Sequence, residues 1–153
     1  MNRHLSRVIT MQTLYEWDFR PNSDMAEIKK RNIDNYQEDA DQEYIDLTIK
    51  GVQKKQKEID KQIAQAAPEW PLEQIASIDK TILRISIYEI LYSNDVPPKV
   101  AINEAVELGK TFGGQNSSKF INGVLGTVYR SSSKYDPKDD VKPPTTKEKD
   151  EQQ

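Results

Sequence analysis

The sequence contains no cysteine and a single histidine, His4. The absence of cysteine excludes disulfides, thiolate metal sites and cysteine nucleophiles, and one histidine argues strongly against a histidine-based metal or catalytic cluster. No apolar run approaches the roughly 20 residues that span a bilayer, and no signal peptide opens the chain. We therefore expect a cytoplasmic protein that has no membrane contact and no cofactor.

The chain also lacks any strong excess of positive charge. Its formal net charge is −3, so bulk basicity does not indicate nucleic-acid binding, although a local basic patch is compatible with this balance. With 153 residues, 35% of them hydrophobic and 31% charged, the composition favours one small, well-solvated helical domain with a single core.

Catalytic patterns are missing as well. The carboxylate pairs Glu104 with Glu107 and Glu73 with Asp79 lie on faces that we expect to be exposed, whereas a general acid needs a desolvated pocket. The glycine pair 113–114 follows no strand and lacks the lysine of a phosphate-binding loop. We therefore expect a binding protein and no enzyme.

What the sequence does contain is a series of amphipathic helical patterns. The first covers residues 3–18, and its basic beginning places Arg3 and Arg7 on one face, beside His4. Cations at a helix N-terminus oppose the helix dipole. Either this first turn is simply solvated, or an anionic ligand relieves the conflict.

The middle of the chain predicts two further helices before a buried one. An acidic, weakly amphipathic stretch starts at Met25 and is followed by a loop near 37–42, and a sharper helical pattern runs from Glu43 until Pro68 and Pro71 interrupt it. Residues 78–92 are apolar over most of the helical circumference, which predicts the most buried helix. We place its outer edge at four charged residues: Asp79, Lys80, Arg84 and Glu89.

A helical hairpin follows, from 101–112 and 119–129, with the glycine pair between its helices. The second helix can be capped by Asn116, Ser117 or Ser118. Because glycine inside a helix costs about 1 kcal/mol relative to alanine, we expect a neighbouring helix or a ligand to approach Gly123 and Gly126 closely. Residues 131–153 are charged and proline-rich, and we predict that they form a disordered C-terminal tail.

The hairpin sequence VPPKVAINEAVELGKTFGGQNSSKFINGVLG is similar to the signature of the NusB family of transcription antitermination factors. The buried run IDKTILRISIYEIL and the opening RxxxMQTLYEWD also look like their counterparts in that family. The resemblance covers roughly residues 3–130, so the domain it defines is 1–130.

This resemblance implies an all-α, NusB-like bundle of about seven helices in two three-helix subdomains. It further implies a non-catalytic protein that binds the boxA element of ribosomal RNA leader transcripts as a heterodimer with the ribosomal protein NusE. The complex would join other Nus factors on RNA polymerase and suppress premature termination.

The same resemblance assigns site residues. An arginine-rich N-terminus meets RNA in the family, and this role passes to Arg3, His4 and Arg7, although Leu5 stands where the family often has another basic residue. The remaining RNA-facing and partner-facing positions lie on several of the predicted helices. For RNA they are Tyr15, Lys119 and Phe120, and for the protein partner Tyr15, Asp79 and Glu104.

Each assignment has a structural alternative. Phe120 can belong to the core, Tyr15 can bury its ring and expose its hydroxyl, and Glu104 can fix an interhelical contact. A protein-interaction module that keeps the NusE contact without RNA binding is a second reading of the whole chain, and the free protein can be a monomer or a homodimer. An accessory domain of an RNA methyltransferase is a third reading, which the absence of cysteine and of a following catalytic domain disfavours.

Overall fold

The computed structural model describes residues 2–36 and 39–139. They form six α-helices and two short 3-10 helices: α1 (Arg3–Phe19), α2 (Met25–Tyr36), α3 (Gln42–Ala66), η1 (Leu72–Gln74), α4 (Ser77–Tyr92), α5 (Pro98–Phe112), α6 (Ser117–Arg130) and η2 (Pro137–Asp139). The described residues contain no strand, and the expected all-α class is confirmed. None of these helices combines the length and the apolar character that a membrane crossing requires.

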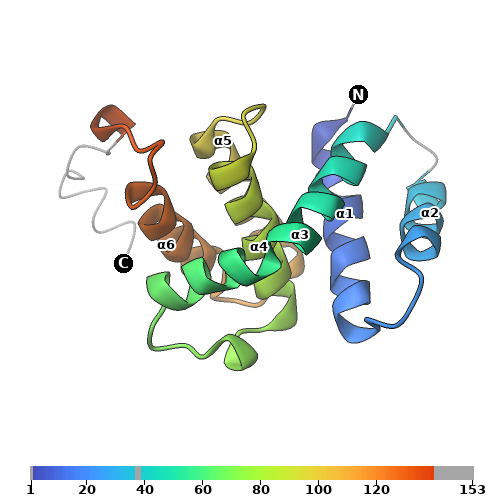
Figure 1. Ribbon diagram of the computed structural model, residues 1–153, viewed down its shortest axis with the longest axis horizontal. Coiled ribbons are helices and arrows are strands. Elements are labelled where there is room, and N and C mark those ends of the chain that lie inside the picture. The colour runs from blue at the N-terminus through green and yellow to red at the C-terminus, as the bar shows by residue number, and fades with distance from the viewer. Residues whose placement is uncertain (1, 37–38, 140–153) are drawn as a thin grey trace.

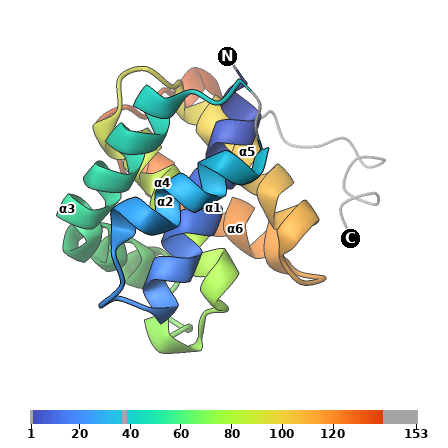
Figure 2. The same cartoon turned by 90° about the vertical axis from the view of Figure 1, so that its right-hand side faces the viewer.

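The helices form two groups of three that share one core. Figure 1 shows α1 and α2 at one end, α6 at the other, α4 and α5 between them, and α3 running across the molecule. In the view turned by 90°, α2 lies across α1 (Figure 2). Helices α4, α5 and α6 pack on one another, while α3 also contacts α4 and α6, and α1 contacts α4. Because buried side chains from both groups belong to one cluster, the predicted two subdomains are continuous in their packing.

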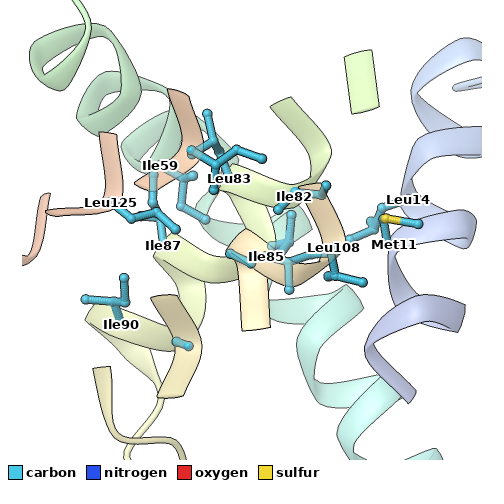
Figure 3. Packing of buried hydrophobic residues seen from close by; sticks show 14 of the residues in the cluster. Met11, Leu14, Ile59, Ile82, Leu83, Ile85, Ile87, Ile90, Leu108 and Leu125 are labelled. Atoms are coloured by element: carbon cyan, nitrogen blue, oxygen red, sulfur yellow. The ribbon is translucent and has the colours of Figure 1, made fainter. Parts of the chain in front are cut away.

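Helix α4 lies at the centre of this core, as its apolar circumference predicts. Figure 3 shows its isoleucines and leucine pointing in several directions, with Ile87 near Ile59 and Leu125, and Ile82 toward the side of Met11 and Leu14. Full burial of one such side chain stabilises the fold by about 1.5–3 kcal/mol. Because the buried side chains of α4 pack against helices of both groups, α4 joins the two groups into one core.

Local chemistry explains some of the helix starts but not that of α6. The side chain of Asn2 accepts a hydrogen bond from the backbone N–H of Leu5 at 2.9 Å and caps α1, and Pro98 begins α5. The side chain of Asn116, by contrast, makes no capping bond to α6. The hydroxyl of Ser117 accepts from the N–H of Gly114 at 2.8 Å, so the expected side-chain cap of α6 is wrong.

Close helix packing occurs at glycines other than the expected ones. A Cβ on Gly109 would lie 2.9 Å from Ile121 and 3.3 Å from the Cα of Ser118, so this glycine allows α5 and α6 to approach. A Cβ on Gly123 would meet nothing within 4 Å, and one on Gly126 would meet only Arg130 of its own helix. The expectation of a close helix at these two positions is therefore wrong.

The chain stays folded beyond α6. The ring of Tyr135 packs edge-on against Tyr129 at 5.5 Å, Lys134 Nζ donates to the carbonyl of Ser93 at 2.6 Å, and the hydroxyl of Tyr129 donates to Asp139. The prediction of disorder is therefore wrong for residues 131–139. The rest of the predicted tail, 140–153, lies outside the described residues.

Candidate functional site

The three cations predicted to bind RNA at the start of α1 occupy different environments. The side chains of Arg3 and His4 are 41% and 59% exposed. Arg7 is buried, and its Nε lies 3.1 Å and 3.3 Å from the two carboxylate oxygens of Glu89. The prediction that Arg7 faces RNA needs an exposed guanidinium, which this position does not provide.

Glu89 also receives a hydrogen bond from a third helix. The hydroxyl of Tyr44 on α3 donates to the Glu89 carboxylate, and its ring lies 5.4 Å from Arg7 Cζ. Burial raises the pKa of Tyr44 well above its ordinary value, and the negative charge of Glu89 raises it further. Burial is the largest single effect and lowers the pKa of Arg7, but the charge of Glu89, its hydrogen bond and the other neighbouring groups together outweigh burial, and the net pKa is raised. The anion that relieves the charge conflict at the start of α1 is thus the protein's own Glu89.

The two exposed cations are themselves paired. Arg3 Nη2 lies 3.2 Å from Asp41, and its Cζ lies 4.6 Å from the centroid of the Tyr44 ring. His4 Nδ1 lies 3.2 Å from Glu104 Oε2, which is also 3.8 Å from Arg7 Nη1. Glu104, predicted to meet the protein partner, thus bridges α5 to α1.

A second cluster forms a cavity of about 310 Å³ where α4 and α6 begin. The rings of Trp70 and Phe120 lie 6.3 Å apart at 73° on its wall, and Trp70 is 49% exposed. Asp79 also lines the cavity, is buried, and has an Oδ1 with no hydrogen-bond partner within the described residues. We call this site the aromatic pocket; the other residues that line it are Gln74, Ile75, Ala76, Asn116 and Ser117.

The prolines after α3 explain how Trp70 reaches this pocket. Pro68 and Pro71 end the helix, and the N–H of Trp70 donates to the carbonyl of Ala67 at 3.0 Å, which turns the chain. Lys119 is exposed on α6 next to Phe120, which is half-buried. The residues predicted from the sequence to form the site do not include Trp70; its position between two prolines, in a turn that follows a helix, is the signal by which it could have been found.

Tyr15 lies on another part of the surface, at the C-terminal half of α1. It is half-buried, its ring packs edge-on against Phe19 at 5.0 Å, and both residues line a shallow groove. Asp18, one turn further on, lies 3.1 Å from Arg84 and 3.7 Å from Lys80. Because Lys80 and Arg84 both belong to α4, these ion pairs hold the C-terminal end of α1 beside the first turns of α4, next to Asp79.

The predicted outer edge of α4 is wrong for three of its four residues. Asp79, Arg84 and Glu89 are all buried. Arg84 donates to both oxygens of Asp60, at 2.9 Å and 3.0 Å, and to Asp18. Burial is the largest single effect and lowers the pKa of Arg84, but the hydrogen bonds and charges of Asp60 and Asp18 together outweigh it, and the pKa is raised. The charges of Arg84 and Glu89 are inside because partners on other helices neutralise them.

The sequence model of the NusB family matches residues 4–130. The chain belongs to the NusB family. It is 43% identical over 130 residues to the transcription antitermination protein NusB of Dehalococcoides mccartyi (strain CBDB1), a match that covers 85% of this chain and 91% of that protein. It is 40% identical over 133 residues to the transcription antitermination protein NusB of Clostridium novyi (strain NT), covering 86% of this chain and all of that protein.

Solved NusB structures share the fold. T. maritima NusB superposes with a TM-score of 0.80 at 28% identity, covering 87% of this chain and 94% of that one. A chain from the crystal structure of antitermination factors NusB and NusE in complex with dsRNA gives a TM-score of 0.74 at 22% identity, covering 84% and 96%. Membership in the NusB family makes this chain a transcription antitermination factor and not an enzyme.

Proposed function

We propose that this chain binds boxA-type RNA of ribosomal RNA leaders as a heterodimer with NusE and so suppresses premature termination. It acts in the cytoplasm, with other Nus factors and RNA polymerase. The observation that carries the RNA part of the proposal is the aromatic pocket, which combines two rings with polar groups and an adjacent lysine, Lys119. The solved assembly of NusB and NusE with dsRNA supports the choice of NusE and RNA as the classes of partner.

The aromatic pocket suits an unpaired base. Bases stack on aromatic side chains without a strict sequence requirement, at about 1–3 kcal/mol per base. Trp70 offers half of its surface to solvent, Phe120 stands edge-on to it, and Lys119 can hold a phosphate nearby. Single-stranded RNA satisfies both requirements together.

The N-terminal cations have divided roles in this proposal. Arg3 and His4 are exposed and contact phosphates, in exchange for their present carboxylate partners. Arg7 is a positioning residue, because its ion pair with Glu89 fixes the first turns of α1 on α4.

We assign the NusE contact to Asp79, Tyr15 and Glu104. Asp79 carries a buried oxygen without a partner in the described part of the chain, and such an oxygen gains most from an N–H or O–H supplied by another molecule. Tyr15 and Phe19 provide an aromatic surface at the C-terminal half of α1.

The test is a titration of a labelled boxA-type RNA at several salt concentrations, with and without NusE. We expect binding that NusE strengthens and salt weakens, and a loss on the order of tenfold for Trp70→Ala and for Phe120→Ala. Trp17→Phe is the matched control, because Trp17 lies on α1 and does not line the aromatic pocket. Unchanged RNA affinity in both pocket variants would refute the aromatic pocket as the RNA-binding surface. Sedimentation of the free protein, without RNA or NusE, distinguishes a monomer from a homodimer.

A protein-interaction module without RNA binding is the second candidate. It is favoured by the burial of Arg7 and by the pairing of His4 with Glu104, which leave little free positive charge at the N-terminus. Under this candidate NusE binds the wild-type chain, the titration with RNA shows no binding, and Arg3→Ala does not change the affinity for NusE.

A further inference from the structure

Four lysines form one face of α3. Lys50, Lys54, Lys57 and Lys61 are all exposed. At 3.6 residues per turn they fall within a sector of about 60° and extend over about 16 Å of the helix. We call this surface the α3 lysine face.

These lysines lack the partners that cations elsewhere in the protein have. Lys29 lies 2.6 Å from Asp46, Lys30 lies 3.2 Å from Asp34, and Lys80 lies 3.7 Å from Asp18. Within residues 2–36 and 39–139, none of the four lysines of the α3 lysine face forms an ion pair.

This arrangement works against the helix that carries it. Lys50 with Lys54, and Lys57 with Lys61, are like-charge pairs four residues apart, and each pair destabilises a helix by a few tenths of a kcal/mol. A face that served only solubility would be expected to alternate charges of both signs. An anionic ligand removes the repulsion.

An aromatic pair borders the same helix. The rings of Tyr88 and Tyr92 on α4 stack at 6.2 Å, and the ammonium of Lys55 lies 5.3 Å from the centroid of Tyr92. Tyr92 is exposed, and Gly51 leaves room for Tyr88, whose ring and hydroxyl atoms would lie only 2.1–2.7 Å from a Cβ there. Lysines beside an exposed aromatic ring are the combination that binds single-stranded nucleic acid.

The chain itself connects this surface to the aromatic pocket. Lys61 lies near the C-terminal end of α3, and the turn after Ala66 leads to Trp70 on the wall of the pocket. Figure 1 shows α3 crossing the molecule toward η1 and the start of α4. An RNA strand that leaves the pocket along α3 would meet Lys61 first and Lys50 last.

We propose that the α3 lysine face binds the phosphates of a single-stranded RNA segment next to the segment held in the aromatic pocket, with Tyr92 as a stacking platform. The occupant is RNA because the charge of the face is complementary to a phosphate backbone and because the adjoining pocket is itself proposed to hold a base. The inference rests on the proposed function. It adds a second contact surface and predicts a longer RNA footprint.

The experiment compares two RNAs on the full-length chain: a boxA-type RNA of about 12 nucleotides, and the same RNA extended by about 10 unstructured nucleotides on either side. The wild-type chain should bind the extended RNA more tightly and with a steeper salt dependence. In the K50Q/K54Q/K57Q/K61Q variant this gain should fall by on the order of tenfold at low salt, and the salt slope should become shallower by up to about 3. Binding of the short RNA should be nearly unchanged.

The matched control is K30Q/K99Q/K110Q/K138Q, which removes the same charge from exposed lysines outside the face. It should retain the gain from the extension. Equal loss in both variants would reduce the effect to net charge and overturn the proposal. Loss of NusE binding with unchanged RNA binding would also overturn it, because the face would then contact a protein.

The outcomes separate this inference from the proposed function. If the wild-type chain binds neither RNA, with or without NusE, both fail. If it binds the short RNA and the extension adds nothing, only the α3 lysine face is refuted. Because the sequence has no cysteine, Lys57→Cys carrying a photo-cross-linker gives a positional readout: it should label nucleotides of the extension, whereas Lys30→Cys should not.

Discussion

Arg7 on α1 and Glu89 on α4 form an ion pair in which the side chains are only 5% and 2% exposed, with Nε 3.1 Å from Oε1. Tyr44 of α3 donates to the same carboxylate, so three helices meet at one buried negative charge. Such a contact fixes the relative position of the helices more than it adds net stability, because desolvation offsets much of the attraction.

Arg7→Ala should therefore destabilise the fold strongly. Among the described residues, removal of the guanidinium leaves the buried Glu89 carboxylate with Tyr44 as its one side-chain donor, and loss of one partner of a buried pair costs about 3–5 kcal/mol. Urea unfolding measures this change in the free energy of unfolding. Arg3→Ala is the control, because its pair with Asp41 is partly exposed and worth at most about 1 kcal/mol. Equal effects would contradict the structural role of Arg7.

Tyr44→Phe should alter stability at alkaline pH. The folded-state pKa of Tyr44 is raised by burial and by Glu89, so its contribution is fully present below the unfolded pKa of about 10 and is lost as the pH rises through the folded pKa. The wild type should be more stable than the variant at neutral pH, and the difference should shrink above about pH 10. Unfolding curves of both proteins at several pH values test this; a constant difference would contradict it.

Two glycines of α-helices should respond to alanine with opposite sign. A Cβ at Gly51 would lie 2.1 Å from the ring of Tyr88, so Gly51→Ala should destabilise the fold by about 1–3 kcal/mol. A Cβ at Gly123 meets nothing, so Gly123→Ala should stabilise the helix by about 0.5–1 kcal/mol. The midpoints of thermal unfolding of the two variants test both signs. A Gly123→Ala variant that is less stable than the wild type would contradict the prediction, because it would mean that the added methyl group meets an unfavourable contact.

Asp79→Asn should separate partner binding from folding. The substitution removes a buried charge whose Oδ1 has no partner in the described chain, and also an attraction to the N-terminus of α4, so stability should change by no more than about 1 kcal/mol. Affinity for NusE should fall on the order of tenfold if Asp79 accepts a hydrogen bond from it. Calorimetric titration measures the affinity. Glu73→Gln on the neighbouring exposed turn is the control and should bind normally.

The helices could be predicted because apolar residues recur with helical spacing and prolines mark the boundaries. The burial of Arg84 and Glu89 could not, because their partners Asp18, Asp60 and Arg7 are distant in sequence. A charged residue in a helical pattern is normally solvated, and only the assembled bundle shows that its charge is neutralised.

The candidate site could be predicted only in part, because it too depends on contacts between residues that are distant in sequence. The resemblance to NusB proteins placed Phe120 and Asp79 in the functional surface, and the structure brings both to the aromatic pocket. It could not show that Trp70 completes this pocket, since the contact depends on how the turn after α3 folds back. Whether RNA and NusE use these residues stays a prediction.

The folded segment after α6 matters for how the C-terminus is studied. The family match ends at residue 130, but Tyr129 holds Asp139 and Tyr135, and Lys134 is tied to the carbonyl of Ser93 at the end of α4. A chain cut after Arg130 would expose the Tyr129 ring and free the C-terminal end of α4. Any loss of activity in such a truncation would then reflect damage to the packing of α4 and α6. A truncation after Asp139 keeps these contacts and therefore tests the role of residues 140–153 alone.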